Sequence, residues 1–148
     1  MKAIVQRVTH AKVTVESPPY EASVQQGLCI FLGVEEGDGE MQATWMAKKL
    51  ANLRIFRDEH GKMNCSVLDI EGEILLISQF TLAGDCSKGN RPSFVKAAQP
   101  EIAEPLVMQV GEMLQTTHKV PVKTGVFGAM MNIALTNDGP VTLIVERD

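Results

Sequence analysis

Two short polar stretches of this 148-residue chain have side chains that could perform chemistry. The first, Ser78-Gln79-Phe80-Thr81, directly follows a run of apolar residues, Ile74 to Ile77. Hydroxyl and amide groups at the end of a buried strand often lie at a crevice, because loops converge there. Unpaired backbone N–H groups of Phe80 and Thr81 would form an oxyanion hole, worth a few kcal/mol of transition-state stabilisation per donor. The alternative is an ordinary buried strand that ends in polar residues.

The second stretch, Asn137 to Thr142 (NDGPVT), lies between two apolar runs, Met131 to Leu135 and Val141 to Val145. We interpret it as a tight turn between strands, because Gly139 can adopt backbone angles closed to other residues and Pro140 has a fixed φ. A Gly-Pro bond can also be cis at modest cost, which would aim two consecutive carbonyls the same way. A turn without further function is the simpler interpretation.

Other residue types that often do chemistry occur in less favourable contexts. They are three histidines and three cysteines: His10, His60, His118, Cys29, Cys65 and Cys86. The histidines are far apart and lie in no Ser-His-Asp or Cys-His pattern, so we expect them on the surface or in loops. The cysteines match neither a zinc pattern nor a disulfide framework. We therefore expect no metal site and no cofactor.

Composition limits the class of protein. Apolar residues make up 45% and charged residues 22% of the chain, the balance of a soluble globular protein, and we find no repeat or linker. We expect a single domain over residues 1–148. A net charge of −4 argues against non-specific coating of nucleic acid, but leaves room for a local basic group at Lys88, Arg91 and Lys96 that could hold phosphates. Because we see no signal peptide and no apolar run of membrane length, we expect a cytoplasmic protein.

The apolar patterns predict the elements that position these residues. Residues 4–8 and 12–15 are two adjoining strands or one bent strand, and the continuous apolar run 27–34 is a strand buried on both faces. Residues 53–57 alternate as a further strand. The order is strands, helix, strands, helix, strands. The fold class is therefore α/β, a single domain of mixed β-sheet layers with two main helices.

Spacing within the two helices predicts which side of each is buried. The first helix has an apolar side made of Met41, Trp45 and Leu50 and of the small residues Ala43, Ala47 and Ala51. The second begins at Pro100 or Glu101 and ends before Pro121. Its apolar positions, spaced by four, are Ile102, Leu106, Val110 and Leu114.

Taken together, the SQFTL and N-x-G-P-V-T stretches resemble the D-aminoacyl-tRNA deacylase family, which carries one motif of each type. The resemblance extends over essentially the whole chain. Residues 88–94 resemble the family's KG-x-RPSF loop, and residues 124–131 its T-G-x-F-G-x-x-M segment. Two positions depart from the family pattern: Val126 stands where arginine is expected, and Ala83 where an aromatic residue is frequent. We expect these to change affinity and substrate preference more than reaction type.

The resemblance implies a homodimer with a cross-subunit active site that hydrolyses the ester bond of D-aminoacyl-tRNA at its 3′-terminal adenosine. In the family the Gly-Pro bond is cis and enters the active site of the opposite subunit. Its carbonyls hold the α-amino group and leave no room for an L side chain, so Gly139 and Pro140 would be a chirality filter. Glycine has no side chain to reject, so glycyl-tRNA on the wrong acceptor would be cleaved too. The implied role is proofreading in translation quality control.

The resemblance also assigns roles to individual residues. The implied residues are Ser78, Gln79, Phe80 and Thr81 in catalysis, Gly139 and Pro140 in the filter, and Arg7, Phe127, Met131, Asn137 and Thr142 in support. No general base is evident beside Thr81, so we favour backbone N–H groups and the substrate's ribose 2′-OH over a covalent threonine.

Two other classes of function remain open from the sequence. A non-catalytic tRNA-binding module would keep the fold without the activity, and would be favoured by loss of either motif. A generic esterase using Thr81 would hydrolyse simple esters without tRNA.

Overall fold

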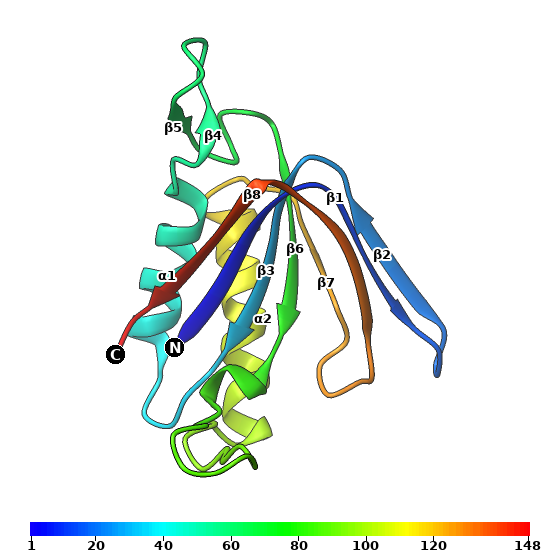
Figure 1. Ribbon diagram of the computed structural model, residues 1–148, viewed down its shortest axis with the longest axis vertical. Coiled ribbons are helices and arrows are strands. Elements are labelled where there is room, and N and C mark those ends of the chain that lie inside the picture. Colours follow the sequence, from blue (N-terminus) through cyan, green and yellow to red (C-terminus); the bar gives the residue numbers. More distant parts are fainter.

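The computed structural model describes residues 1–148 and consists of a curved mixed β-sheet with two long helices against one face (Figure 1). The strands are β1 (Lys2–Val15), β2 (Tyr20–Val24), β3 (Gly27–Gly33), β4 (Phe56–Arg57), β5 (Met63–Cys65), β6 (Glu73–Ser78), β7 (Val122–Thr124) and β8 (Asn132–Glu146). The helices are α1 (Glu40–Asn52), the short 3-10 helix η1 (Phe80–Ala83) and α2 (Pro100–Thr116). The predicted order of strands and helices and the α/β class are confirmed.

The long strand β1 organises the sheet. Residues 4–15 belong to one continuous strand, which pairs with β3 over residues 2–8, with β2 over residues 11–15, and with β8 along its other edge. The pairing with β8 is irregular between residues 6 and 10. β3, β6 and β7 continue the sheet in parallel. Because an irregular register bends and twists a strand, the second half of β1 curls over the rest of the sheet.

The curl brings the two lateral strands β2 and β7 together and makes the sheet nearly a barrel. The Tyr20 hydroxyl donates a hydrogen bond to the carbonyl oxygen of Thr124 at 2.7 Å, and Lys123 Nζ donates to that of Ser23 at 2.7 Å. A small apolar core that includes Val13, Cys29 and Leu75 fills the curl. A larger core lies between the other face of the sheet and the helices.

In α1 the buried side differs in part from the predicted one. Leu50 and the three alanines are buried as predicted, but Met46 is buried in place of Met41, which is 66% exposed. Met46 shares a helical stripe with Ala43 and Leu50, at intervals of three and four residues, and Met41 does not.

In α2 Pro100 is the first residue, as predicted, and the helix ends at Thr116. Val110 and Leu114 are buried as expected, but Ile102 is 53% exposed and Ala103 and Val107 are buried instead. A spacing of four advances about 400° around the helix axis, so each step drifts by about 40° and Ile102 leaves the face of Leu114. Neither α1 nor α2 is long and apolar enough to cross a membrane.

Two further predictions are wrong in detail. Only Phe56 and Arg57 of the predicted strand 53–57 are in a strand, β4, which forms a small hairpin with β5 at one end of the sheet (Figure 1). The stretch 137–142 is no turn between strands, because residues 132–135 and 142–145 on either side of it both lie in β8 and both pair with β1. A single long partner strand therefore keeps the chain extended through the Gly-Pro sequence.

Candidate active site

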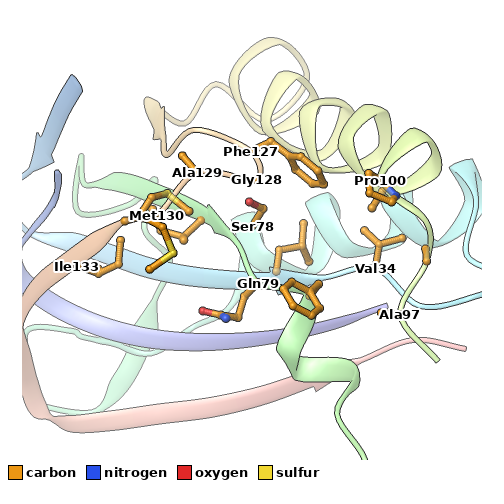
Figure 2. A pocket seen from close by; sticks show the side chains of 16 residues that line it. Val34, Ser78, Gln79, Ala97, Pro100, Phe127, Gly128, Ala129, Met130 and Ile133 are labelled. Carbon is orange, nitrogen blue, oxygen red and sulfur yellow. The ribbon is translucent and has the colours of Figure 1, made fainter. Parts of the chain in front are cut away.

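A cavity of about 560 Å³ opens where β6 ends (Figure 2). Twelve of its sixteen lining residues are hydrophobic, and its polar side chains are those of Ser78 and Gln79. Phe80, Phe127 and Met131 contribute to its walls. The fold thus brings together five residues that the sequence pointed to, from β6, η1 and the loop after β7.

The short helix η1 leaves two backbone donors unused beside this cavity. The last ladder bond of the segment runs from the Gln79 N–H to the carbonyl oxygen of Leu32 at 2.8 Å. The first donor of η1 is Leu82, so the N–H groups of Phe80 and Thr81 precede it and find no acceptor in the chain. The first residues of any helix lack a preceding turn to bond to. Two adjacent free donors are thus available to a ligand oxygen, and an oxyanion hole is built from donors of this kind.

Thr81 itself is exposed and does not line the cavity. Its hydroxyl oxygen accepts a hydrogen bond from Gln79 Nε2 at 2.6 Å, and no basic group contacts it. The histidines lie elsewhere: the His10 ring meets the hydroxyls of Thr9 and Thr136, and no histidine lines the cavity. The Thr81 hydroxyl therefore has no neighbour that would remove its proton. No group of three or more histidine, cysteine or acidic side chains gathers in the chain.

The second polar stretch forms a bulge in β8. Asn137 pairs with Val8 and Thr142 with Gln6, so the residues between them face a single residue of β1. The Asn137 side chain spans this bulge: its Oδ1 accepts a hydrogen bond from the Val141 N–H at 2.8 Å, and its Nδ2 donates to Thr142 Oγ1 at 2.8 Å. Gln6 Nε2 also donates to Thr142 Oγ1, at 3.2 Å. The side chains of Asn137 and Thr142 thus hold the two ends of the bulge together.

Gly139 and Pro140 lie at the exposed tip of the bulge. The peptide bond between them is cis, and Gly139 has a φ of +131°. A Cβ atom on Gly139 would lie 3.0 Å from Nη2 of Arg7 and 3.0 Å from Cγ2 of Val141. Residue 139 therefore has to be glycine on two counts, its backbone angle and its close neighbours.

Arg7 holds the bulge from beneath. Its side chain is only 3% exposed; Nε donates to the carbonyl oxygen of Asp138 at 3.0 Å, and Nη1 donates to that of Ile55 at 2.7 Å. The Asp138 carboxylate lies 3.5 Å from Nε. A buried guanidinium is costly unless its donors are satisfied, and these acceptors satisfy it. The link to Ile55 is a contact for which the sequence carries no signal.

Within one chain the cavity and the bulge are far apart. Val8 pairs with Asn137 on one side and with Gly27 on the other, and Gly27 pairs with Glu73 at the start of β6. Ser78 lies at the other end of that strand, five residues on, which is about 17 Å at 3.3 Å per residue. Figure 1 shows the bend of β8 at the end of the sheet opposite to η1. None of the bulge residues lines the cavity.

Part of the cavity wall was not expected from the sequence. The additional lining residues include Leu32, Val34, Ala97, Ala98, Pro100, Ala103, Gly128, Ala129, Met130 and Ile133. Figure 2 shows Ser78 and Gln79 between the labelled residues Phe127 and Pro100 on one side and Ile133 on another. The only local signal for this wall is its small residues, such as Ala97, Ala98 and Gly128, which leave space when the surrounding elements pack.

Comparisons with known proteins identify the family of this chain. A sequence model of the D-Tyr-tRNA(Tyr) deacylase family matches residues 4–146. A D-aminoacyl-tRNA deacylase of Halalkalibacterium halodurans is 53% identical over 146 residues, covering 99% of this chain and 99% of that protein. One of Flavobacterium psychrophilum is 48% identical, covering 99% and 97%. The solved structure of a c-Myc DNA Unwinding Element Binding Protein superposes with a TM-score of 0.91 at 42% identity, covering 100% of this chain and 99% of that one. As its two motifs predicted, the chain belongs to the D-aminoacyl-tRNA deacylase family.

Proposed function

We propose that this protein hydrolyses the ester that joins a D-amino acid, or a misplaced glycine, to the 3′-terminal adenosine of tRNA. The observation that carries this proposal is the pair of unused N–H groups at Phe80 and Thr81 beside the cavity. Free donors of this kind would stabilise the oxyanion that forms when water attacks an ester carbonyl. The cavity volume of about 560 Å³ lies in the range that small-molecule sites occupy, and its apolar walls suit an adenine ring.

The reaction needs no covalent intermediate. Water adds to the ester carbonyl, the negative charge on its oxygen is held by the two N–H groups, and the C–O bond to the ribose breaks. The amino acid leaves as a carboxylate and the tRNA regains its hydroxyl. The substrate's neighbouring ribose 2′-OH assists the attacking water, since the Thr81 hydroxyl has no base beside it. An aminoacyl ester is already activated, so no metal or cofactor is required by this route.

We assign chirality selection to the Gly139–Pro140 bulge of a second copy of the chain. The bulge lies about one strand length of β6 away from its own cavity and does not line it, but it is exposed and can enter the cavity of a partner. The carbonyl oxygens of Gly139 and Pro140 would hold the α-amino group of the substrate. An L side chain would then collide with backbone, whereas a D side chain points away and glycine has none. Arg7, Asn137 and Thr142 keep the bulge in shape through the contacts described above.

An apolar row across the sheet supports a homodimer. Ile144 of β8 pairs with Ile4, Ile4 with Phe31, and Phe31 with Ile77, so these side chains share one face. Ala3 and Val5, their neighbours along β1, point to the opposite face, where they join the core under the helices. Ile144 is 67% exposed, and Ile77 lines the cavity. A second copy that packs against this row would therefore also lie next to the opening of the cavity.

We place the enzyme in the cytoplasm, together with its tRNA substrate. The test is hydrolysis of matched D-Tyr-tRNA and L-Tyr-tRNA by the purified protein in a buffer of cytoplasmic pH and salt. Rapid loss of the D-ester with the L-ester intact is the expected result. Equal hydrolysis of both would remove the chirality filter and favour a generic esterase. Hydrolysis of neither, with tRNA still bound, would favour a binding module.

A further inference from the structure

A loop beside the cavity carries most of the local positive charge. We define the basic loop as residues 84–96, between η1 and the cavity-lining residues that precede α2. Asp85 and Ser93 close it through two backbone hydrogen bonds, from the Asp85 N–H to the Ser93 oxygen at 2.8 Å and back at 3.0 Å. The Asp85 carboxylate accepts the Ser87 N–H at 2.9 Å. The loop therefore has a defined shape although it contains no regular helix.

The basic loop is also fixed to the helix that carries the free N–H groups. The Phe94 ring packs edge-on against Phe80, with 5.2 Å between centroids and 69° between planes. Gly84 makes room for it, since a Cβ there would lie 2.9 Å from Phe94. At the far end, the Lys96 carbonyl oxygen accepts the Glu36 N–H at 2.8 Å. The loop thus keeps a set position relative to the oxyanion site and the cavity mouth.

The charges of the loop are available to a ligand. Lys88, Arg91 and Lys96 are exposed, and none forms an ion pair within the chain. The only carboxylate in the loop is that of Asp85, whose pKa is held below its ordinary value by hydrogen bonds from Ser87 and, to a smaller extent, by the charge of Lys96. The loop therefore carries a net +2 in a chain whose formal charge is −4. At the base of the loop the backbones of Glu35 and Glu36 pair with those of Ala97 and Lys96, and neither carboxylate forms an ion pair with Lys96.

We propose that the basic loop binds the backbone phosphates of the single-stranded 3′ end of tRNA while the terminal aminoacyl-adenosine occupies the adjoining cavity. This inference rests on the proposed function. Each nucleotide that precedes the terminal adenosine carries a phosphate, so a strand that leaves the cavity must pass its rim. Cations fixed there add affinity without base contacts, and they do so in a salt-dependent way. A net acidic protein can in this way hold tRNA only at the end on which it acts.

The experiment compares the triple variant Lys88→Gln, Arg91→Gln, Lys96→Gln with the triple variant Lys48→Gln, Lys49→Gln, Lys119→Gln. The control also removes three positive charges, from exposed lysines at or just after the C-terminal ends of α1 and α2, whereas the basic loop precedes the N-terminal end of α2. Two substrates are used: D-Tyr-tRNA, and D-tyrosyl-adenosine, which has no further phosphates to reach the loop. Binding of uncharged tRNA is measured in parallel between 50 and 200 mM salt, concentrations over which phosphate contacts weaken by orders of magnitude.

The loop variant should raise KM for D-Tyr-tRNA by about tenfold or more, with kcat nearly unchanged, and cleave D-tyrosyl-adenosine as the parent does. Its slope of log binding constant against log salt should be shallower by about 2, at roughly 0.7 per phosphate lost. The control should match the parent in all three. An unchanged salt slope and an unchanged KM for D-Tyr-tRNA would overturn the loop proposal while leaving the deacylase function standing. Failure of the parent to cleave D-tyrosyl-adenosine and D-Tyr-tRNA would instead overturn the proposed function, and the salt slope would still decide for or against the loop.

Discussion

The Nε atom of Arg7 donates a hydrogen bond to the backbone carbonyl oxygen of Asp138 at 3.0 Å, one residue before Gly139. A buried side chain of β1 thus fixes the backbone of an exposed bulge in β8. Because the same guanidinium also donates to Ile55, the bulge is tied to the segment that follows α1. The position of the bulge is therefore set by β1, by β8 and by the segment after α1.

Arg7→Lys tests this link. An ammonium group cannot make both fixed donations, so one carbonyl loses its charged partner, and we expect the free energy of unfolding to fall by about 1.5–3 kcal/mol. A bulge displaced by about 1 Å should lower the rate of D-Tyr-tRNA hydrolysis by roughly 100-fold. Urea denaturation and single-turnover deacylation measure the two effects. Arg57→Lys, at an exposed arginine near the same end, is the control and should change neither; a fully active Arg7→Lys protein would contradict the role.

Gly139→Ala adds a Cβ 3.0 Å from Arg7 Nη2 at a φ of +131°. We expect roughly 1–3 kcal/mol of strain and at least a tenfold loss of D-Tyr-tRNA hydrolysis. Gly37→Ala is matched, since Gly37 has a φ of +92° but open space around it. If both variants lose activity equally, the loss reflects general destabilisation and not the filter. Circular dichroism melts on both proteins allow that comparison.

Thr81→Ala separates the two catalytic schemes. The Thr81 hydroxyl accepts a hydrogen bond from Gln79 and has no base beside it, so we expect less than a tenfold fall in kcat for D-Tyr-tRNA. The backbone N–H of residue 81 is retained in alanine. A fall of about 1,000-fold or more would identify Thr81 as the nucleophile and reject the water route.

Ile144→Lys tests the proposed subunit interface. A charge at the exposed end of the apolar row should be strongly unfavourable there once a second copy covers it, so we expect a monomer and little deacylation. Met41→Lys is a matched control, because Met41 of α1 is 66% exposed and Ile144 is 67% exposed. Sedimentation velocity gives the subunit number. A dimer with full activity in Ile144→Lys would place the interface elsewhere.

Burial raises the pKa of the Cys29 thiol to about 12, from an ordinary 9.0. The folded state therefore holds this proton more tightly than the unfolded chain. The resulting stability is fully present below about pH 9 and is lost as the pH rises towards 12. Between pH 9 and 11, the free energy of unfolding should fall by about 1.4 kcal/mol per pH unit more in the parent than in Cys29→Ala. Cys86→Ala, at an exposed thiol, should decline like the parent; identical slopes for all three would reject the assignment.

Some properties of this protein follow from the sequence alone. The order of strands and helices was predictable because apolar spacing is a local signal, and the start of α2 was predictable because proline is favoured at the first turn of a helix. The family was predictable because SQFTL and N-x-G-P-V-T occur together and in order. The residues around the cavity at Ser78 and Phe80 were predictable in part, since polar residues at the end of a buried strand converge with neighbouring loops.

Other properties were decided only by tertiary structure. N-D-G-P is equally compatible with a turn or a bulge, and the long pairing of β8 with β1 selects the bulge. The separation of the Gly139 bulge from the cavity depends on the register of strands distant in sequence. Contacts between distant segments produce no periodic pattern in the sequence. The conformation of each such segment depends on the segment that packs against it and not on the residues next to it in the chain.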